Sequence, residues 1–350
     1  MFHVDYLAGG ALKLLVTLLY WPIQSLTRWD GPLNLSLDLV FYRLDKPMSD
    51  KPHQRDQHGV RAVPAYFIPA GGDAPVKEEC LVVEEAMLTI DVQDVGWYTL
   101  MWTQTDSARE VVGFTKAEGV LAGTDDPEVL ALAAGFLFTE GLIHDLGDIA
   151  IMEVCSSDPS IVRVELVDPA AADPKRRNIT IGSSCSVCGG REALDNLVAE
   201  LESIQDTTHL DSEQFAQLMS AMRKLQTVFE TTGGAHAAAV FNRDAEIIAV
   251  AEDLGRHNAL DKVIGKCLLS GKDLAGCGVL LSSRLSLEMI TKAIRAGFEI
   301  VAAVSAPTSL AIEIADRFGV TLCGFVRGGR ATIYSHPQRI KEIARVVSVS

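Results

Sequence analysis

The sequence predicts an α/β protein with a smaller α+β region ahead of the α/β part, and three observations support this. Of the 350 residues, 48% are hydrophobic, as in a globular protein with a sizeable core. Between residues 79 and 170, short strand patterns surround a helical pattern. From residue 171 onward, helical and strand patterns alternate, as in a sheet with covering helices. We therefore divide the chain into residues 1–78, 79–170 and 171–350.

The first of these parts begins with a strongly apolar segment, Tyr6–Leu26, which contains Lys13 and Pro22. A membrane-spanning helix needs about 20 continuous apolar residues, so we favour a packed extension over an interfacial anchor or a targeting segment. We do not expect it to contact a membrane. Residues 45–78 are polar and rich in proline and glycine, which predicts a linker.

The second part contains strand patterns and an internal near-repeat. The strand patterns are Leu81–Val83, Met87–Val92, Trp97–Trp102, Ile149–Cys155 and Ile161–Val167. Residues 109–121 and 131–143 both contain the pattern GFxxxEG. Each copy is typical of a helix that ends at a glycine, so we expect two helices, and we interpret the duplication as a packing feature.

The third part alternates between the two kinds of pattern. Helical faces are expected at Leu194–Leu201, at Phe215–Met222 after an Asp211 cap, at Leu260–Leu268, at Leu285–Ala296 and at Thr308–Phe318. Strands are expected at Ala237–Phe241, Glu246–Ala251, Val279–Ser282, Ile300–Ser305 and Thr321–Val326, the first two as a hairpin. This order predicts a largely parallel sheet covered by helices.

Charge and cysteine content restrict the possible partners and the compartment. The chain has 31 Lys and Arg against 46 Asp and Glu, a net charge of −15, which argues against a nucleic-acid binder. A local pocket for one anionic small molecule remains compatible with this charge. The seven cysteines are too sparse for a disulfide scaffold, and the composition favours a reducing cytoplasm.

The only closely spaced thiols are Cys185 and Cys188, in the segment SSCSVCGG. A helix is expected to begin near Arg191, and a helix N-terminus lowers the pKa of a nearby thiol and so favours its reactive thiolate. Structural cysteines and half of a zinc site are alternatives, but a structural zinc needs four ligands, and the sequence has no second CxxC pair. Reactive thiol chemistry is the favoured interpretation, and we expect no resident metal.

Two further segments contain groups that suit an anionic ligand. The first runs from Glu252 to Lys262, where a strand pattern ends and a helix pattern begins, and it contains Arg256 and His257. Ligands of open α/β sheets bind at such junctions, where helix N–H groups favour anions. His257 could transfer protons or act as a capping donor, and we expect Asp253 to orient Arg256 or His257.

The second segment is Phe325–Arg330, FVRGGR, at the end of the last strand pattern. Its two arginines and two glycines allow guanidinium and backbone donors to approach a pyrophosphate closely. Ser305–Ser309 follows the preceding strand pattern. Both loops are therefore predicted to open at the same edge of the sheet.

Taken together, these motifs resemble one family. SSCSVCGG, TGGAH, EDLGRHNALDK, SRLSLEM, SAPTSLA and TLCGFVRGGR occur in the order expected of the FdhD/NarQ family, the formate dehydrogenase accessory sulfurtransferases. LAAGFLFTEGLI is similar to the N-terminal helix motif of that family. The resemblance covers residues 80–337, and it implies a homodimer whose C-terminal domain has a cytidine-deaminase-like α/β fold.

The resemblance also implies an activity and its residues. Sulfur would be taken as a persulfide from a cysteine desulfurase and passed to the Mo- or W-bis(molybdopterin guanine dinucleotide) cofactor, bound as substrate, that formate dehydrogenase needs. Cys185 resembles the persulfide-bearing cysteine and Cys188 its partner. The stretch that binds the cofactor matches Phe325, Val326, Arg327, Gly328, Gly329 and Arg330. To this predicted pocket we add Arg256, His257, Ser305 and Thr308.

Three other functions can be weighed against this one. A zinc deaminase would need His-x-Glu and Pro-Cys-x-x-Cys, whereas His236 is followed by two alanines and Ser184 precedes Cys185. A dithiol redox protein would leave the FVRGGR segment without a role. The remaining alternative is a non-catalytic chaperone that binds and inserts the cofactor, with a structural or zinc-binding CxxC.

Overall fold

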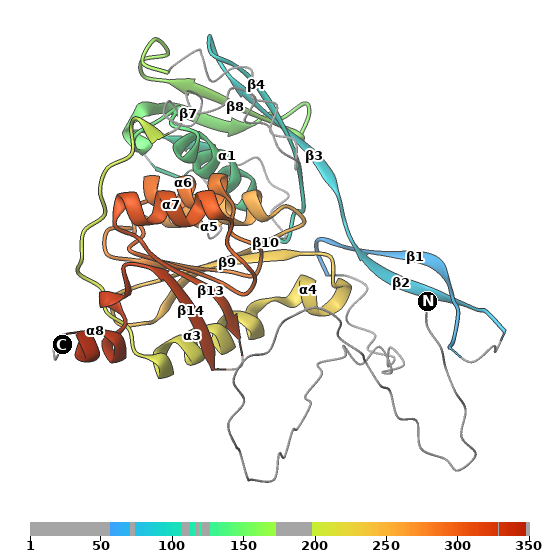
Figure 1. Cartoon of the computed structure of the whole chain (residues 1–350). Helices are drawn as coiled ribbons and strands as arrows, with labels where there is room; N and C mark the ends of the chain where they lie inside the picture. Colours follow the sequence, from blue (N-terminus) through green and yellow to red (C-terminus); the bar gives the residue numbers. More distant parts are fainter. Residues whose placement is uncertain are drawn as a thin grey trace, which may run out of the picture. The chain divides into compact units, whose positions relative to one another are not determined.

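The structure is a computed structural model of the whole chain (Figure 1). The residues it describes are 57–70, 74–106, 113–116, 119–120, 127–172, 198–327 and 329–347. Residues 51–350 form one compact unit. The predictions for Tyr6–Leu26 and for the first turn of the helix expected from Leu194 lie outside the described residues. The boundaries at residues 78 and 170 stay predictions.

The first sheet has two antiparallel strands, β1 (Val60–Phe67) and β2 (Val76–Val83). This corrects the linker predicted for residues 45–78, because both strands begin inside that range. Pro64 is compatible with a strand here because β1 pairs on one side only, so its missing N–H need not interrupt a second ladder. The prolines and glycines that follow Phe67 lie between the two strands.

The second sheet has six strands in the order β4-β3-β8-β7-β5-β6. These strands are β3 (Ala86–Val92), β4 (Gly96–Trp102), β5 (Gly113–Thr115), β6 (Gly119–Val120), β7 (Ile149–Val154) and β8 (Ile161–Leu166). The strands predicted from their alternating patterns are confirmed, and β7 and β8 pair antiparallel as expected. A short 3₁₀ helix, η1 (Leu146–Asp148), precedes β7.

The two copies of the near-repeat fold differently. The second copy, residues 131–143, contains most of helix α1 (Glu128–Thr139) and confirms the prediction. The first copy, residues 109–121, contains β5 and β6, so the helix predicted there is wrong. Phe114 of β5 pairs with Met152 of β7, and this pairing with a distant strand overrides the local helical pattern.

The third sheet has six strands in the order β10-β9-β11-β12-β13-β14. They are β9 (His236–Phe241), β10 (Ile247–Asp253), β11 (Gly278–Leu281), β12 (Ile300–Ala303), β13 (Thr321–Arg327) and β14 (Arg330–Ser335). Strands β11, β12 and β13 pair parallel, whereas the β9–β10, β9–β11 and β13–β14 pairs are antiparallel. The sheet is therefore mixed, which corrects the largely parallel sheet predicted. Hairpins at both ends of the strand order require the antiparallel pairs, and β14 was not predicted.

Helices cover both faces of this sheet (Figure 1). They are α3 (Ser212–Leu225), α4 (Thr227–Thr232), α5 (Arg256–Leu269), α6 (Leu287–Arg295), α7 (Ser309–Phe318) and α8 (Lys341–Val347), with a 3₁₀ helix η3 (Pro337–Arg339) before α8. Val279 and Leu281 of β11 pack in the core with α5, α6 and α7, whereas Leu280 packs with α3 on the other face. The predicted helices around Phe215, Leu260, Leu285 and Thr308 are confirmed.

Helix α1 lies between the second sheet and α5. Most of its residues are buried, as expected for a helix that is apolar on all sides. A Cβ atom on Gly135 would overlap the carbonyl of Asp261 in α5, and one on Gly265 would overlap the carbonyl of Ala131 in α1. The two helices therefore approach backbone to backbone, which only glycine allows at these positions.

The fold thus confirms the predicted α/β class, with a second, smaller sheet built around β3–β8. The more specific cytidine-deaminase-like assignment stays a prediction. Among the described helices, none combines the length and the apolar character that a bilayer span requires.

Candidate functional site

The predicted ligand loops follow strands that end at one edge of the third sheet. Strands β10 and β11 both run antiparallel to β9, and β11, β12 and β13 run parallel. The carboxyl ends of these four strands therefore lie at the same edge, which we call the carboxyl edge. Open α/β sheets bind ligands at this edge.

Asp253 fixes the loop between β10 and α5. Its fully buried Oδ1 accepts hydrogen bonds from Gly255 N (2.8 Å) and Asn258 Nδ2 (3.0 Å). Its Oδ2 accepts one from Thr103 N (3.0 Å) and lies 2.9 Å from Lys262 Nζ. This corrects the expectation that Asp253 orients Arg256 or His257 directly, because its described partners hold the backbone turn that precedes them.

Lys262 connects this loop to helix α1. Its buried Nζ also lies 3.4 Å from Glu128 Oε2, at the start of α1. Burial raises the pKa of Glu128, but Lys262, Lys266 and hydrogen bonds from Thr105 outweigh it and leave the pKa below its usual value. The carboxylate is therefore ionised at neutral pH, and the buried charges are matched.

His257, in the first turn of α5, contacts one acidic side chain and lies near a second histidine. His257 Nε2 lies 2.9 Å from Glu288 Oε2, in the first turn of α6. The contact with His257 lowers the pKa of Glu288, against the effect of burial. His236, which pairs with Asp253 across β9 and β10, has a pKa lowered by burial and by the nearby Arg256.

The β12–α7 loop joins the same edge. Ser305 O accepts a hydrogen bond from Phe325 N (3.1 Å), which confirms that this loop and the end of β13 open together. Thr308 Oγ1 caps α7 by accepting a hydrogen bond from Ala311 N (3.3 Å). The hydroxyl predicted to bind ligand thus has a local structural partner, and its ligand role stays a prediction.

The FVRGGR segment forms the β13–β14 hairpin. Arg327 pairs with Arg330, and both side chains are exposed. Phe325 has a φ of +53°, a conformation that is rare outside glycine, and its side chain is 40% exposed. Val326 is buried in the core with α3, so its side chain does not face a ligand at this edge. Gly328 lies outside the described residues, and Gly329 takes the turn at a φ of +71°.

The two predicted catalytic cysteines, Cys185 and Cys188, also lie outside the described residues, as does the helix start expected near Arg191. The five cysteines that the structure describes carry free thiols. No cluster of His, Cys, Asp and Glu within the described ranges could hold a metal ion. The relation of the thiols to the carboxyl edge therefore stays a prediction.

Arg284 and Glu288 were missed by the sequence analysis, although both belong to the quoted motif SRLSLEM. Arg284 is exposed on the loop between β11 and α6, at the carboxyl edge. Arg256 begins α5, and Arg327 and Arg330 flank the β13–β14 turn, so four arginines lie on or beside three loops of this edge. Among the described residues none of the four has an ion-pair partner. The edge can therefore attract and bind an anion.

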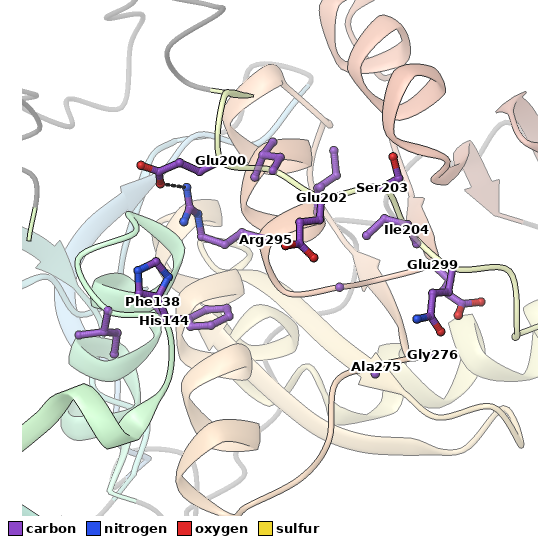
Figure 2. A pocket seen from close by; sticks show the side chains of 15 residues that line it. Phe138, His144, Glu200, Glu202, Ser203, Ile204, Ala275, Gly276, Arg295 and Glu299 are labelled. Atoms are coloured by element: carbon purple, nitrogen blue, oxygen red, sulfur yellow. Dashed lines mark hydrogen bonds and ion pairs between the residues drawn. The ribbon is translucent and has the colours of Figure 1, made fainter. Parts of the chain in front are cut away.

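A separate pocket lies at the opposite edge, before β11 and β12, with a volume of about 390 Å³ (Figure 2). Its lining includes Phe138, His144, Glu200 to Gln205, Ala275, Gly276, Arg295 and Glu299. Arg295 reaches Glu200 across it at 3.3 Å. None of the predicted site residues lines it.

Comparisons with known proteins agree with the motifs. The model of the FdhD/NarQ family matches residues 126–341. A Thermoplasma acidophilum protein named sulfur carrier protein FdhD is 41% identical over 232 residues, covering 65% of this chain and 81% of that protein. A Streptomyces avermitilis protein of the same name is 39% identical over 273 residues, covering 77% of this chain and 92% of that protein.

A solved structure shares the fold. The crystal structure of a protein from Desulfotalea psychrophila, described as a formate dehydrogenase accessory protein, aligns with a TM-score of 0.61 at 22% identity. The alignment covers 81% of this chain and 99% of that one. Since the family model spans more than half of the chain and the motifs of the carboxyl edge fall within it, the chain belongs to the FdhD/NarQ family.

Proposed function

We propose that this protein is a sulfur carrier that takes persulfide sulfur from a cysteine desulfurase. It passes this sulfur to the Mo- or W-bis(molybdopterin guanine dinucleotide) cofactor that formate dehydrogenase needs. The names of its relatives support the sulfur-carrier role. The arginines at the carboxyl edge support the choice of a ligand that contains two pyrophosphates.

The arginine content of the carboxyl edge is the observation that supports the proposed ligand. Arg256, Arg284, Arg327 and Arg330 lie on or beside three loops of this edge, while the whole chain has a net charge of −15. A local excess of guanidinium groups on an acidic protein is expected where a polyanion binds, because arginine donates paired hydrogen bonds to phosphate oxygens. The hydrogen bond from Phe325 N to Ser305 O joins two of the predicted ligand loops.

The sulfur half of the proposal uses Cys185 as the carrier thiol. The Cys185 thiolate attacks the outer sulfur of the desulfurase persulfide, the donor S–S bond breaks, and the donor cysteine leaves as a thiolate. Cys185 then holds the sulfur as a persulfide until the cofactor accepts it. Cys188, three residues later, is its partner. We propose a cytoplasmic location, because a reducing compartment keeps these thiols available, and a homodimer, because the family resemblance implies one.

The test is intact mass spectrometry of the purified full chain after incubation with a cysteine desulfurase and cysteine. The wild type and Cys188→Ala are each compared with Cys185→Ala, and Cys80→Ala, which removes a half-buried thiol of β2, is the matched control. We expect the gain of one sulfur mass in the wild type and the control, and its loss in Cys185→Ala. A wild type that gains no sulfur and holds zinc would overturn the proposal and favour the cofactor-binding chaperone.

A further inference from the structure

Glu288 is an acidic residue at the carboxyl edge, where four arginines also lie. It belongs to the SRLSLEM motif, to which the proposed function assigns only Arg284. Its side chain is 37% exposed, and it lies in the first turn of α6, where the helix dipole favours a negative charge. An acid close to a polyanion site should weaken binding unless it has another purpose.

The contacts of Glu288 indicate that purpose. Its Oε2 lies 2.9 Å from Nε2 of His257, whose side chain is 11% exposed. His257 lies in the first turn of α5, one residue after Arg256 and beyond the turn that Asp253 holds. The contact therefore joins the first turns of α5 and α6, which follow two different strands of the carboxyl edge.

We propose that Glu288 is a positioning residue that holds the His257 ring so that His257 contacts the phosphates of the bound nucleotide. This inference rests on the proposed function, because it takes the guanine nucleotide part of the cofactor as the ligand. The Glu288 carboxylate, 2.9 Å from Nε2, occupies that side of the ring, which leaves Nδ1 for the ligand and restricts the positions of the ring before the ligand arrives.

The charged groups around the pair agree with this role. Arg256 on α5 and His236 on β9 face the same region, as does Asp253 on β10, and Lys292 approaches Glu288 from α6. The pKa of His236 is lowered by burial and by Arg256, so that ring adds no positive charge beside His257 at pH 7. The lowered pKa of Glu288 keeps the carboxylate ionised under the same conditions.

The experiment measures binding of GDP to the full chain by calorimetry. If Glu288 acts by positioning His257, Glu288→Gln weakens binding by about threefold to tenfold, because glutamine keeps an oxygen beside Nε2 but loses the carboxylate charge that holds the ring. If Glu288 merely repels the nucleotide, the same variant binds more tightly. Glu313→Gln, which changes an exposed glutamate of α7, is the matched control and should bind as the wild type does.

A double-variant cycle separates positioning from an independent contact. His257→Ala combined with Glu288→Gln should bind no more weakly than His257→Ala alone, because Glu288 acts through His257. Losses that multiply in the double variant would overturn the inference, as would unchanged or tighter binding in Glu288→Gln. The nitrogen signals of the His257 ring in NMR spectra of the ligand-free protein should also change in Glu288→Gln, and unchanged signals would contradict the positioning role.

Failure of this inference can be distinguished from failure of the proposed ligand site. Arg327→Ala should reduce GDP binding whether or not Glu288 positions His257. If Arg327→Ala weakens binding but Glu288→Gln does not, the positioning role alone is wrong. If the wild type does not bind GDP, the nucleotide site at the carboxyl edge is wrong, and the role of Glu288 falls with it.

Discussion

Replacing Lys262 by methionine should destabilise the protein strongly, because Lys262 is the buried cation that joins α1 to the β10–α5 loop. Its Nζ lies 2.9 Å from Asp253 Oδ2 and 3.4 Å from Glu128 Oε2, and it donates to the carbonyls of Thr103 and Glu252. All three side chains are almost fully inaccessible to solvent. Methionine fills a similar volume but leaves the carboxylates without this partner.

The size of the loss in stability depends on the contacts that the two carboxylates keep in the variant. Removing one partner of a buried ion pair costs about 3–5 kcal/mol. In the variant, Asp253 keeps its three N–H donors, and Glu128 keeps Lys266 at 3.3 Å. We therefore expect the lower end of the range, about 3 kcal/mol, which lowers Tm by roughly 6–12 °C in a domain of this size.

Urea unfolding followed by circular dichroism would measure this loss, with Lys266→Met as the matched control. Lys266 also contacts Glu128 (3.3 Å), but its side chain is 23% exposed, so its removal should cost about 1 kcal/mol or less. Equal losses in the two variants would contradict the reasoning, since Lys262 is fully buried and lies beside two carboxylates whereas Lys266 is partly exposed and lies beside one. A Lys262→Met protein within 1 kcal/mol of the wild type would refute it as well.

Three further predictions test other parts of the structure. Gly265→Ala should destabilise the protein by about 1–3 kcal/mol in urea unfolding, because the new methyl group overlaps the backbone of Ala131. In Gly113→Ala the closest new contact is at 3.6 Å, so its free energy of unfolding should stay within about 0.5 kcal/mol of the wild-type value. The pKa of His236 is lowered in the folded protein, so the unfolded chain binds more protons below pH 6.5. Stability should therefore fall as the pH drops from 6.5. Thermal melts at several pH values should show a smaller dependence of stability on pH in His236→Asn. Burial raises the pKa of Cys323 to about 12, so iodoacetamide at pH 8 should leave Cys323 unmodified in the folded protein and modify it in urea, as peptide mass mapping would show.

Local patterns were sufficient to predict most helices and strands of the third sheet. Leu260, Val263 and Ile264 share one face of α5, and that face packs in the hydrophobic core as predicted. The failures occur where distant pairing decides the structure. Phe114 lies in a helical pattern but pairs with Met152, and Pro64 resembles a linker residue but lies on an edge strand.

The candidate site was only partly predictable for a related reason. Arg256 and Arg327 were found because each lies in a loop with a recognisable composition. Glu288 and its partner His257 are 31 residues apart in sequence, and Lys262 and Glu128 are 134 apart. No local pattern indicates such contacts, since they depend on which helices the sheet order brings together.

The buried charges and the exposed arginines perform complementary tasks. A ligand with two pyrophosphates needs several cations in fixed positions, yet like charges repel and exposed arginine side chains are mobile. Different residues meet these two needs. Buried contacts among Asp253, Lys262 and Glu128 fix the backbone of the β10–α5 loop, while Arg256 stays partly exposed. Asp253 and Glu128 are buried beside Lys262, so they do not stand next to the arginines as an exposed acid would. On this reasoning, Glu288 differs from the buried acids, because it is partly exposed at the edge and contacts a predicted ligand residue.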